Sequence, residues 1–171
     1  MPFSEELTIR IATAEDCATI LGFIRALAEY ERLAQEVIAD EAQLRATLFG
    51  VRPAAEVLIA EVGGAPVGFA LFFQSYSTFL GKPGLYLEDL FVQPAARGRG
   101  CGLALMSALA RIAVLRDYGR FEWAVLDWNE PALRFYAQLG AVRQAEWTVH
   151  RIVGPRLSSL AERWPHAIGM T

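Results

Sequence analysis

The chain begins with two stretches in which apolar residues recur every three or four positions, as on one face of a helix. In the first stretch these residues are Cys17, Ile20, Leu21, Ile24, Leu27 and Ala28. Thr13 and Asp16 have the spacing of a capping box, so we expect this helix to start there and to run to about Tyr30. Asp40 stands at the N-cap position of a second helix that ends near Gly50.

The pattern then changes to short, nearly continuous apolar runs, which are typical of strands. Such runs occupy residues 57–62, 67–76 and 85–92. Gly63-Gly64 has the composition of a two-residue hairpin turn between the first two. Residues 81–84, which contain two glycines and a proline, are expected to form a loop before the third.

Helices and strands alternate in the rest of the chain. Strands are expected at residues 121–126 and 147–152, and helices after the glycine-rich residues 97–102, from Asn129 to Gly140, and after Pro155. The order of elements predicts an α/β fold of the mixed α+β kind, with a mixed central sheet that is mostly antiparallel and flanked by helices. With 171 residues, the chain is expected to form a single domain over residues 1–171.

Composition narrows the class of protein. The chain is 54% hydrophobic and 20% charged, which excludes intrinsic disorder, and no apolar run approaches the roughly 18 residues needed to cross a bilayer. Glu5 and Glu6 stand where a signal peptide would be basic, so we expect a cytoplasmic protein without membrane contacts. A net charge of −3 argues against a general nucleic-acid binder.

The cysteines and histidines give no sign of disulfide bonds or a metal site, and the charges are unevenly distributed along the chain. Cys17 and Cys101 are too few for a disulfide framework, so both are expected to be reduced. His150 and His166 form no cluster with metal-ligand spacing, so no metal site is expected. Residues 1–50 hold nine acids and four bases, whereas residues 96–171 hold six acids and ten bases. This asymmetry fits either a solvated surface or separate sites for a cationic and an anionic ligand.

The strongest local signal is Arg97-x-x-Gly100-x-Gly102, which lies between a predicted strand and a predicted helix. Glycines let a ligand approach the backbone, and a helix start offers unpaired amides and a positive dipole end. The pattern therefore favours a phosphate-binding turn, although a plain turn would also use glycine. It matches neither a P-loop nor a dinucleotide-binding fingerprint.

The same residues carry a resemblance. Arg97-x-x-Gly100-x-Gly102 after residues 87–92 resembles the acetyl-CoA-binding motif of the GNAT acetyltransferase superfamily. A wider set resembles the spermidine/spermine (diamine) N-acetyltransferases and the neighbouring thialysine acetyltransferases: residues 86–92, Trp128-Asn129-Glu130-Pro131, Phe135-Tyr136 and Gly140-Ala141. The likeness runs from about Ile9 to about Ala161. It implies the GNAT fold, acetyl-CoA as co-substrate and a homodimer.

The resemblance also implies which residues bind acetyl-CoA. The strand end at Leu90, Phe91 and Val92 would pair with the pantetheine arm. Backbone amides would hold the pyrophosphate, namely those of Gly98, Arg99, Gly100, Cys101, Gly102 and Leu103, with Arg97 and Arg99 as side-chain partners. The stretch Asn129, Glu130, Pro131 and Ala132 would lie near the arm, although these residues also read as an ordinary helix start.

Acetyl transfer to an amine needs a base and an acid. A primary amine has a pKa of roughly 10.4, so only about one molecule in a thousand is nucleophilic at pH 7.4. The resemblance assigns the proton-accepting role to Glu88 and leaves its neighbour Asp89, expected on the opposite face, as a structural partner. Tyr136 matches the acid that protonates the departing thiolate, and its alternative is a core aromatic of an amphipathic helix.

The resemblance places the amine beside four residues, Tyr30, Glu31, Glu88 and Glu146, although a solvated Glu146 is an equal alternative. A carboxylate beside an aromatic face suits an ammonium group. The predicted activity is direct transfer from acetyl-CoA to a primary amine of a small polyamine or diamine, because no nucleophile to hold the acetyl group stands out. The alternatives are thialysine or another small amine or amino acid side chain and, in a different class, a non-catalytic acetyl-CoA sensor.

Overall fold

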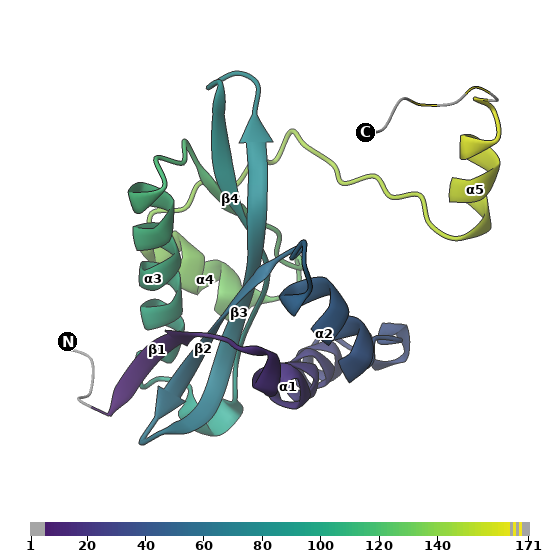
Figure 1. Ribbon diagram of the computed structural model, residues 1–171. Coiled ribbons are helices and arrows are strands. Elements are labelled where there is room, and N and C mark those ends of the chain that lie inside the picture. Colours follow the sequence, from purple (N-terminus) through teal and green to yellow (C-terminus); the bar gives the residue numbers. More distant parts are fainter. Residues whose placement is uncertain (1–5, 165, 167, 169–171) are drawn as a thin grey trace. The chain divides into compact units, whose positions relative to one another are not determined.

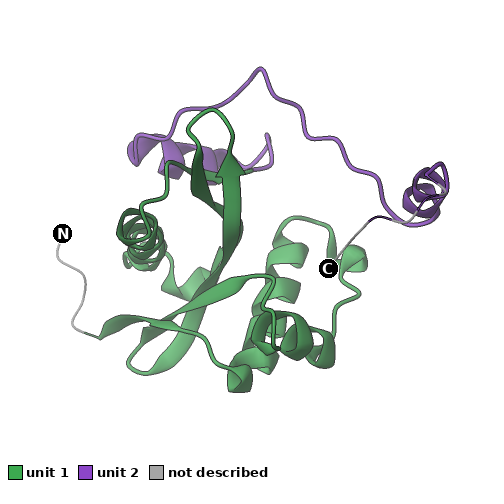
Figure 2. Cartoon of the chain, turned by 45° about the horizontal axis from the view of Figure 1, so that its top comes forward, with its two compact units in different colours: residues 1–124 green, residues 125–171 purple. Residues whose placement is uncertain are grey.

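The computed structural model describes residues 6–164, 166 and 168. The chain divides into two compact units, unit 1 (Met1–Ala124) and unit 2 (Val125–Thr171), coloured green and purple in Figure 2. Each unit is described by itself below.

Unit 1 contains all the strands that the structure describes. They are β1 (Leu7–Ile11), β2 (Glu56–Val62), β3 (Ala65–Ser77), β4 (Lys82–Val92) and β5 (Phe121–Trp123). Its α-helices are α1 (Cys17–Tyr30), α2 (Glu41–Phe49) and α3 (Cys101–Leu115), and its 3-10 turns are η1 (Ala14–Asp16), η2 (Ala34–Glu36) and η3 (Pro94–Ala96). In unit 2 the described helices are α4 (Glu130–Gln138) and α5 (Pro155–Ala161).

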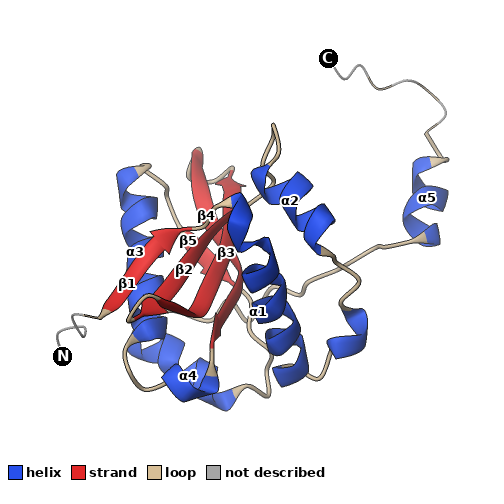
Figure 3. Cartoon of the chain, turned by 60° about the horizontal axis from the view of Figure 1, so that its bottom comes forward, coloured by secondary structure: helices blue, strands red, loops and turns tan. Residues whose placement is uncertain are grey.

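The five strands form one sheet in the order β1-β2-β3-β4-β5. Neighbouring strands are antiparallel except for β4 and β5, which are parallel. The parallel pair requires a crossover, and α3 supplies it between β4 and β5. Figure 3 shows the sheet in red with helices on both of its faces. The predicted mixed, mostly antiparallel sheet flanked by helices is therefore confirmed.

The sheet of unit 1 is buried on both faces. On one face α1 and α2 pack against alternate strand residues, and Phe23, Ile59, Phe69 and Phe91 belong to the resulting core. On the other face lies α3 (Figures 1 and 3), which buries its own apolar stripe there. Strand β2 reads as a continuous apolar run because successive side chains enter opposite faces, both of which are covered.

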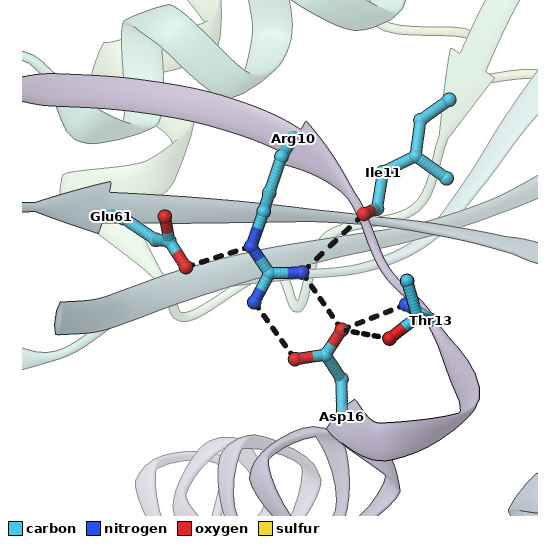
Figure 4. A network of polar contacts seen from close by, with 5 residues as sticks. All are labelled: Arg10, Ile11, Thr13, Asp16 and Glu61. Carbon is cyan, nitrogen blue, oxygen red and sulfur yellow. Dashed lines mark hydrogen bonds and ion pairs between the residues drawn. The ribbon is translucent and has the colours of Figure 1, made fainter. Parts of the chain in front are cut away.

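A network of polar contacts joins β1, β2 and the start of α1 (Figure 4). The guanidinium of Arg10 donates to both carboxylate oxygens of Asp16 at 2.8 Å and to Glu61 at 2.7 Å. Asp16 also accepts the backbone N–H of Thr13 at 2.7 Å, as predicted for the capping box. The Arg10 guanidinium lowers the pKa of Asp16 from 3.8 to about 2. The network therefore ties the N-terminal strand to the sheet and to the first helix.

The third strand of the predicted meander begins earlier than expected. Residues 82–84 were predicted to lie in a loop, but β4 starts at Lys82 and pairs with β3 through Tyr76 and Pro83. The N–H of Leu85 points to the β5 side, where it donates to Arg120. The nitrogen of Pro83, two residues earlier, faces the same side of β4, at a point that β5 does not reach. The N–H that proline lacks would therefore have had no strand to pair with, and no hydrogen bond of the sheet is lost.

Two other predicted strands differ from the structure. The strand expected at residues 121–126 pairs only over Phe121–Trp123, beside Leu85–Leu87 of β4. The strand expected at residues 147–152 is wrong, because no described segment pairs with it and its residues are exposed. Apolar and polar residues alternate from Trp147 to His150 as in a strand, but Trp147 and Val149 are 77% and 76% exposed. The alternation alone does not form a strand where no neighbouring strand pairs with it.

Both cysteines, Cys17 and Cys101, are free thiols and are buried. In the part of the chain that the structure describes, no group of three or more His, Cys, Asp or Glu side chains could hold a metal ion. Across the same residues, no helix combines the length and the apolar character that crossing a bilayer requires.

Candidate active site

The carboxyl-terminal half of β4 is paired on one side only. Its ladder with β3 continues to Val92, which lies opposite Gly68, whereas its ladder with β5 ends at Leu87. Among the described residues, no strand pairs with residues 88–92 on the β5 side. Backbone amides and carbonyls on that side can hydrogen-bond an extended ligand arm, which is the role predicted for Leu90, Phe91 and Val92.

A β-bulge interrupts β4 at the predicted catalytic residue. Leu71 lies opposite Asp89 and the next residue of β3, Phe72, lies opposite Leu87, so Glu88 is skipped in the register. Bulges re-aim a side chain and increase the local twist of a strand. Glu88 is exposed and Asp89 is half-buried, so the two adjacent carboxylates have different environments.

Asp89 is the more perturbed of the two carboxylates. Burial, together with the negative charges of Glu88 and Glu31, raises the pKa of Asp89 from 3.8 to about 6. Burial also raises the pKa of Glu31, the residue after α1. Three carboxylates, Glu31 directly after α1 and Glu88 and Asp89 in β4, therefore shape one negative environment. The resemblance assigned the proton-accepting role to Glu88 and left Asp89 as a structural partner. Adjacency in the sequence does not show which of the two carboxyls is buried.

The glycine-rich turn after β4 has the geometry of an anion-binding loop. Gly98 and Gly100 have φ angles of +73° and +86°, which disfavour residues with a side chain. A Cβ at Gly98 would meet open space, so the backbone there is bare. No side chain caps the start of α3 at Cys101, which leaves its first amides available to an anion. This turn fits the pyrophosphate of acetyl-CoA.

Within the turn the individual side chains have different surroundings. Cys101 is only 1% exposed, so its thiol is not accessible to a ligand. Arg99 and Leu103 are exposed on the same turn, and Gly102 is half-buried. The burial of these residues is compatible with the predicted role of their backbone amides in binding the pyrophosphate.

Arg97 connects the turn to the end of α1. Its Nε donates to the carbonyl of Val92 at 3.0 Å. Its guanidinium carbon lies 4.9 Å from the centre of the Tyr30 ring and 5.9 Å from that of Phe91. The structure thus brings together one predicted cofactor residue, Arg97, and one predicted amine-binding residue, Tyr30.

The other predicted site residues belong to unit 2. Asn129 is buried and its Oδ1 accepts the N–H of Ala132 at 3.3 Å, which confirms it as the N-cap of α4. Pro131 lies in the first turn of that helix, where its missing N–H is harmless. The ring of Tyr136 is half-buried and contacts Phe135, with 5.4 Å between ring centres.

The remaining two unit 2 candidates are on the surface. Glu130 is exposed in the first turn of α4, where its carboxylate lies 3.8 Å from Arg134. Glu146 is exposed in a segment without regular secondary structure.

The sequence matches a known family across both units. Residues 24–141 match the Acetyltransferase (GNAT) family. The chain belongs to this family. A relative, the thialysine N-epsilon-acetyltransferase of Bos taurus, is 40% identical over 164 residues that cover 90% of this chain and 96% of the relative. The spermidine/spermine N(1)-acetyltransferase-like protein 1 of Homo sapiens is 35% identical over 78% of this chain and 20% of its own length.

A solved structure shares the fold of this chain. An integron cassette protein from the mobile metagenome of V. cholerae matches with a TM-score of 0.78 at 28% identity, over 93% of this chain and 99% of that chain. The predicted fold class and the resemblance to GNAT acetyltransferases are therefore both confirmed.

Proposed function

We propose that the protein is an N-acetyltransferase that moves the acetyl group of acetyl-CoA to the primary amine of a small molecule. The observation that supports the proposal is that a turn suited to an anion and a group of carboxylates suited to a cation lie next to each other at the end of β4. A bare, uncapped turn that suits a pyrophosphate follows a strand end with three carboxylates around it, which suits a cationic amine. Arg97 and Tyr30 link the two environments through direct contact.

The donor side is held by backbone groups. The open edge of β4 at residues 90–92 hydrogen-bonds the pantetheine arm, and the amides from Gly98 to Leu103 hold the pyrophosphate. Bound acetyl-CoA would supply a thioester whose carbonyl carbon the amine attacks. A β4 amide that donates to the carbonyl oxygen stabilises the negative charge that develops on it.

Two side chains move the protons. Glu88 accepts a proton from the amine, directly or through water, so that the nitrogen can form the new amide bond. Tyr136 donates its phenolic proton to the sulfur as the carbon–sulfur bond breaks. The transfer is sequential within a ternary complex, because no nucleophile that could hold the acetyl group stands out in the sequence.

Two classes of acceptor have support from relatives. The thialysine N-epsilon-acetyltransferase relative is matched over nearly its whole length, which supports an amino acid side-chain amine. The spermidine/spermine-like relative supports the polyamine or diamine first expected from the sequence, over a smaller share of its length. We therefore place the amino acid side-chain amine first and the polyamine second.

We also propose one catalytic domain per chain and a homodimer. The family match runs from residue 24 to residue 141, across the boundary between unit 1 and unit 2, which supports a single domain. The exposed apolar side chains of Trp147, Val149 and Val153 offer a surface that a second copy could cover. Sedimentation equilibrium should give twice the chain mass, and a monomer at all concentrations would contradict the homodimer.

The function is tested by release of CoA from acetyl-CoA in the presence of thialysine, lysine, ornithine, putrescine, spermidine and spermine. Saturable turnover with the amino acids above that with the polyamines is expected. Turnover with polyamines alone would reverse the order of acceptors. Tight acetyl-CoA binding without turnover on any amine would favour the sensor instead. Glu88→Gln serves as the matched variant, and its rate should fall most at low pH, where the neutral amine is scarcest.

A further inference from the structure

The guanidinium of Arg97 lies over the rings of two residues from different elements. The guanidinium carbon is 4.9 Å from the ring centre of Tyr30, the last residue of α1, and 5.9 Å from that of Phe91 in β4. The Nε of the same guanidinium donates to the Val92 carbonyl at 3.0 Å. Only a planar guanidinium can present a face to a ring and donate from its edge in this way. Arg97 therefore fixes both the strand end and the helix end.

The ring contacts continue into the core of unit 1. Phe91 contacts Phe23 with 6.1 Å between ring centres, and Phe23 stacks on Phe69 at 5.6 Å. Phe23 and Phe69 are 4% and 0% exposed. One side of Arg97 is thus held by rings that cannot move without disturbing the core, so a change at Arg97 is transmitted to Tyr30 rather than absorbed by Phe91.

We propose that Arg97 is a positioning residue that couples the acetyl-CoA turn to the amine-binding end of α1 through the ring of Tyr30. The proposal rests on the proposed function, and it differs from a role for Arg97 as a phosphate partner alone. A residue that only contacts the phosphates affects the binding of acetyl-CoA and not that of the amine. A positioning residue affects the binding of the amine as well. Because coupling between two sites is reciprocal, a change at Tyr30 then also affects the binding of acetyl-CoA.

The first test measures acetyl-CoA binding by calorimetry in the absence of any amine. Tyr30→Leu removes the ring beneath the guanidinium and should weaken acetyl-CoA binding about two- to fivefold, the size of an exposed cation–π contact. Tyr30→Phe keeps the ring and should bind within twofold of the parent. Equal affinity of Tyr30→Leu and the parent would overturn the proposal, as would equal weakening by both variants.

The second test separates the two substrates by steady-state kinetics. Arg97→Lys keeps the charge but loses the planar face, and it should raise the KM of the amine about two- to fivefold. Combining it with Tyr30→Leu should add little, because both changes remove the same contact. Fully additive effects of the two substitutions on the amine KM would overturn the proposal.

Arg99→Ala is the matched control, since it removes an exposed positive charge from the same turn. It should weaken the binding of acetyl-CoA and leave the KM of the amine unchanged. An amine KM raised as much as by Arg97→Lys would mean that turn charge alone explains the effect, against the proposal. The calorimetry needs no turnover, so a parent protein that acetylates no amine would refute the proposed function while the coupling is still decided by acetyl-CoA binding.

Discussion

Replacing Asp89 by Asn should make the protein more stable at neutral pH. Asp89 has a pKa raised from 3.8 to about 6 by burial and by the carboxylates of Glu88 and Glu31. The ionised form is therefore less favourable in the folded protein than in the unfolded chain. The folded state has its full stability below about pH 4, loses part of it as the pH rises toward 6, and does not recover it above that value.

The size of the effect follows from the shift. About two pKa units correspond to about 3 kcal/mol at roughly 1.4 kcal/mol per unit. Water reaches the half-buried carboxylate and screens the neighbouring charges, so we expect about 1–2 kcal/mol in practice. For a chain of this length, that gain corresponds to a rise in Tm of about 2–8 °C.

The assay is urea unfolding of the parent and Asp89→Asn at pH 7.5 and pH 4. The variant should be more stable at pH 7.5, and the two proteins should converge at pH 4, where the parent carboxyl is protonated. Glu88→Gln is the matched control, because this exposed neighbour should change stability by less than about 0.5 kcal/mol. A less stable Asp89→Asn at pH 7.5, or an equal gain at both pH values, would refute the reasoning.

Three further substitutions test other parts of the molecule. Tyr136→Phe should lower kcat about 100-fold or more while the calorimetric Kd of acetyl-CoA stays within twofold, and an unchanged kcat would remove the acid role. Asp16→Asn should cost about 1–2 kcal/mol in urea unfolding at pH 7, because the pKa of Asp16 is lowered to about 2 and the stabilisation is lost between pH 4 and 2; a gap that persists at pH 2 would contradict this. Gly98→Val should cost about 1–2 kcal/mol of strain at φ +73° and weaken acetyl-CoA binding at least tenfold, and unaltered binding would exclude this turn as the acetyl-CoA site.

Elements with strong local signals were predictable from the sequence. Asp40 caps α2 and accepts the N–H of Gln43 at 2.8 Å, and Asn129 caps α4, because a cap depends only on residues within one turn. The turn at Gly63-Gly64 was also predicted, and both residues have positive φ angles. Each of these features is set by fewer than about six neighbouring positions.

Features that depend on distant partners were not predictable. Strand β1, Leu7–Ile11, does alternate apolar and polar residues and was therefore predictable as a strand, but its place at the sheet edge depends on pairing with β2 and on the Arg10 contacts to Glu61 and Asp16. The bulge at Glu88 appears only in the register between β3 and β4. The contact between Arg97 and Tyr30 joins positions 67 residues apart, which no periodicity reveals.

The division of the chain after Ala124 bears on how the protein folds during synthesis. Every described strand, and the α3 crossover between β4 and β5, precedes that boundary. At about 5–20 residues per second, a ribosome needs roughly 2–9 s to add the 47 residues of unit 2. Hairpins and helices form in microseconds, so the sheet has ample time to assemble on the nascent chain. The turn proposed to hold acetyl-CoA can thus be complete before all of unit 2 has left the ribosome.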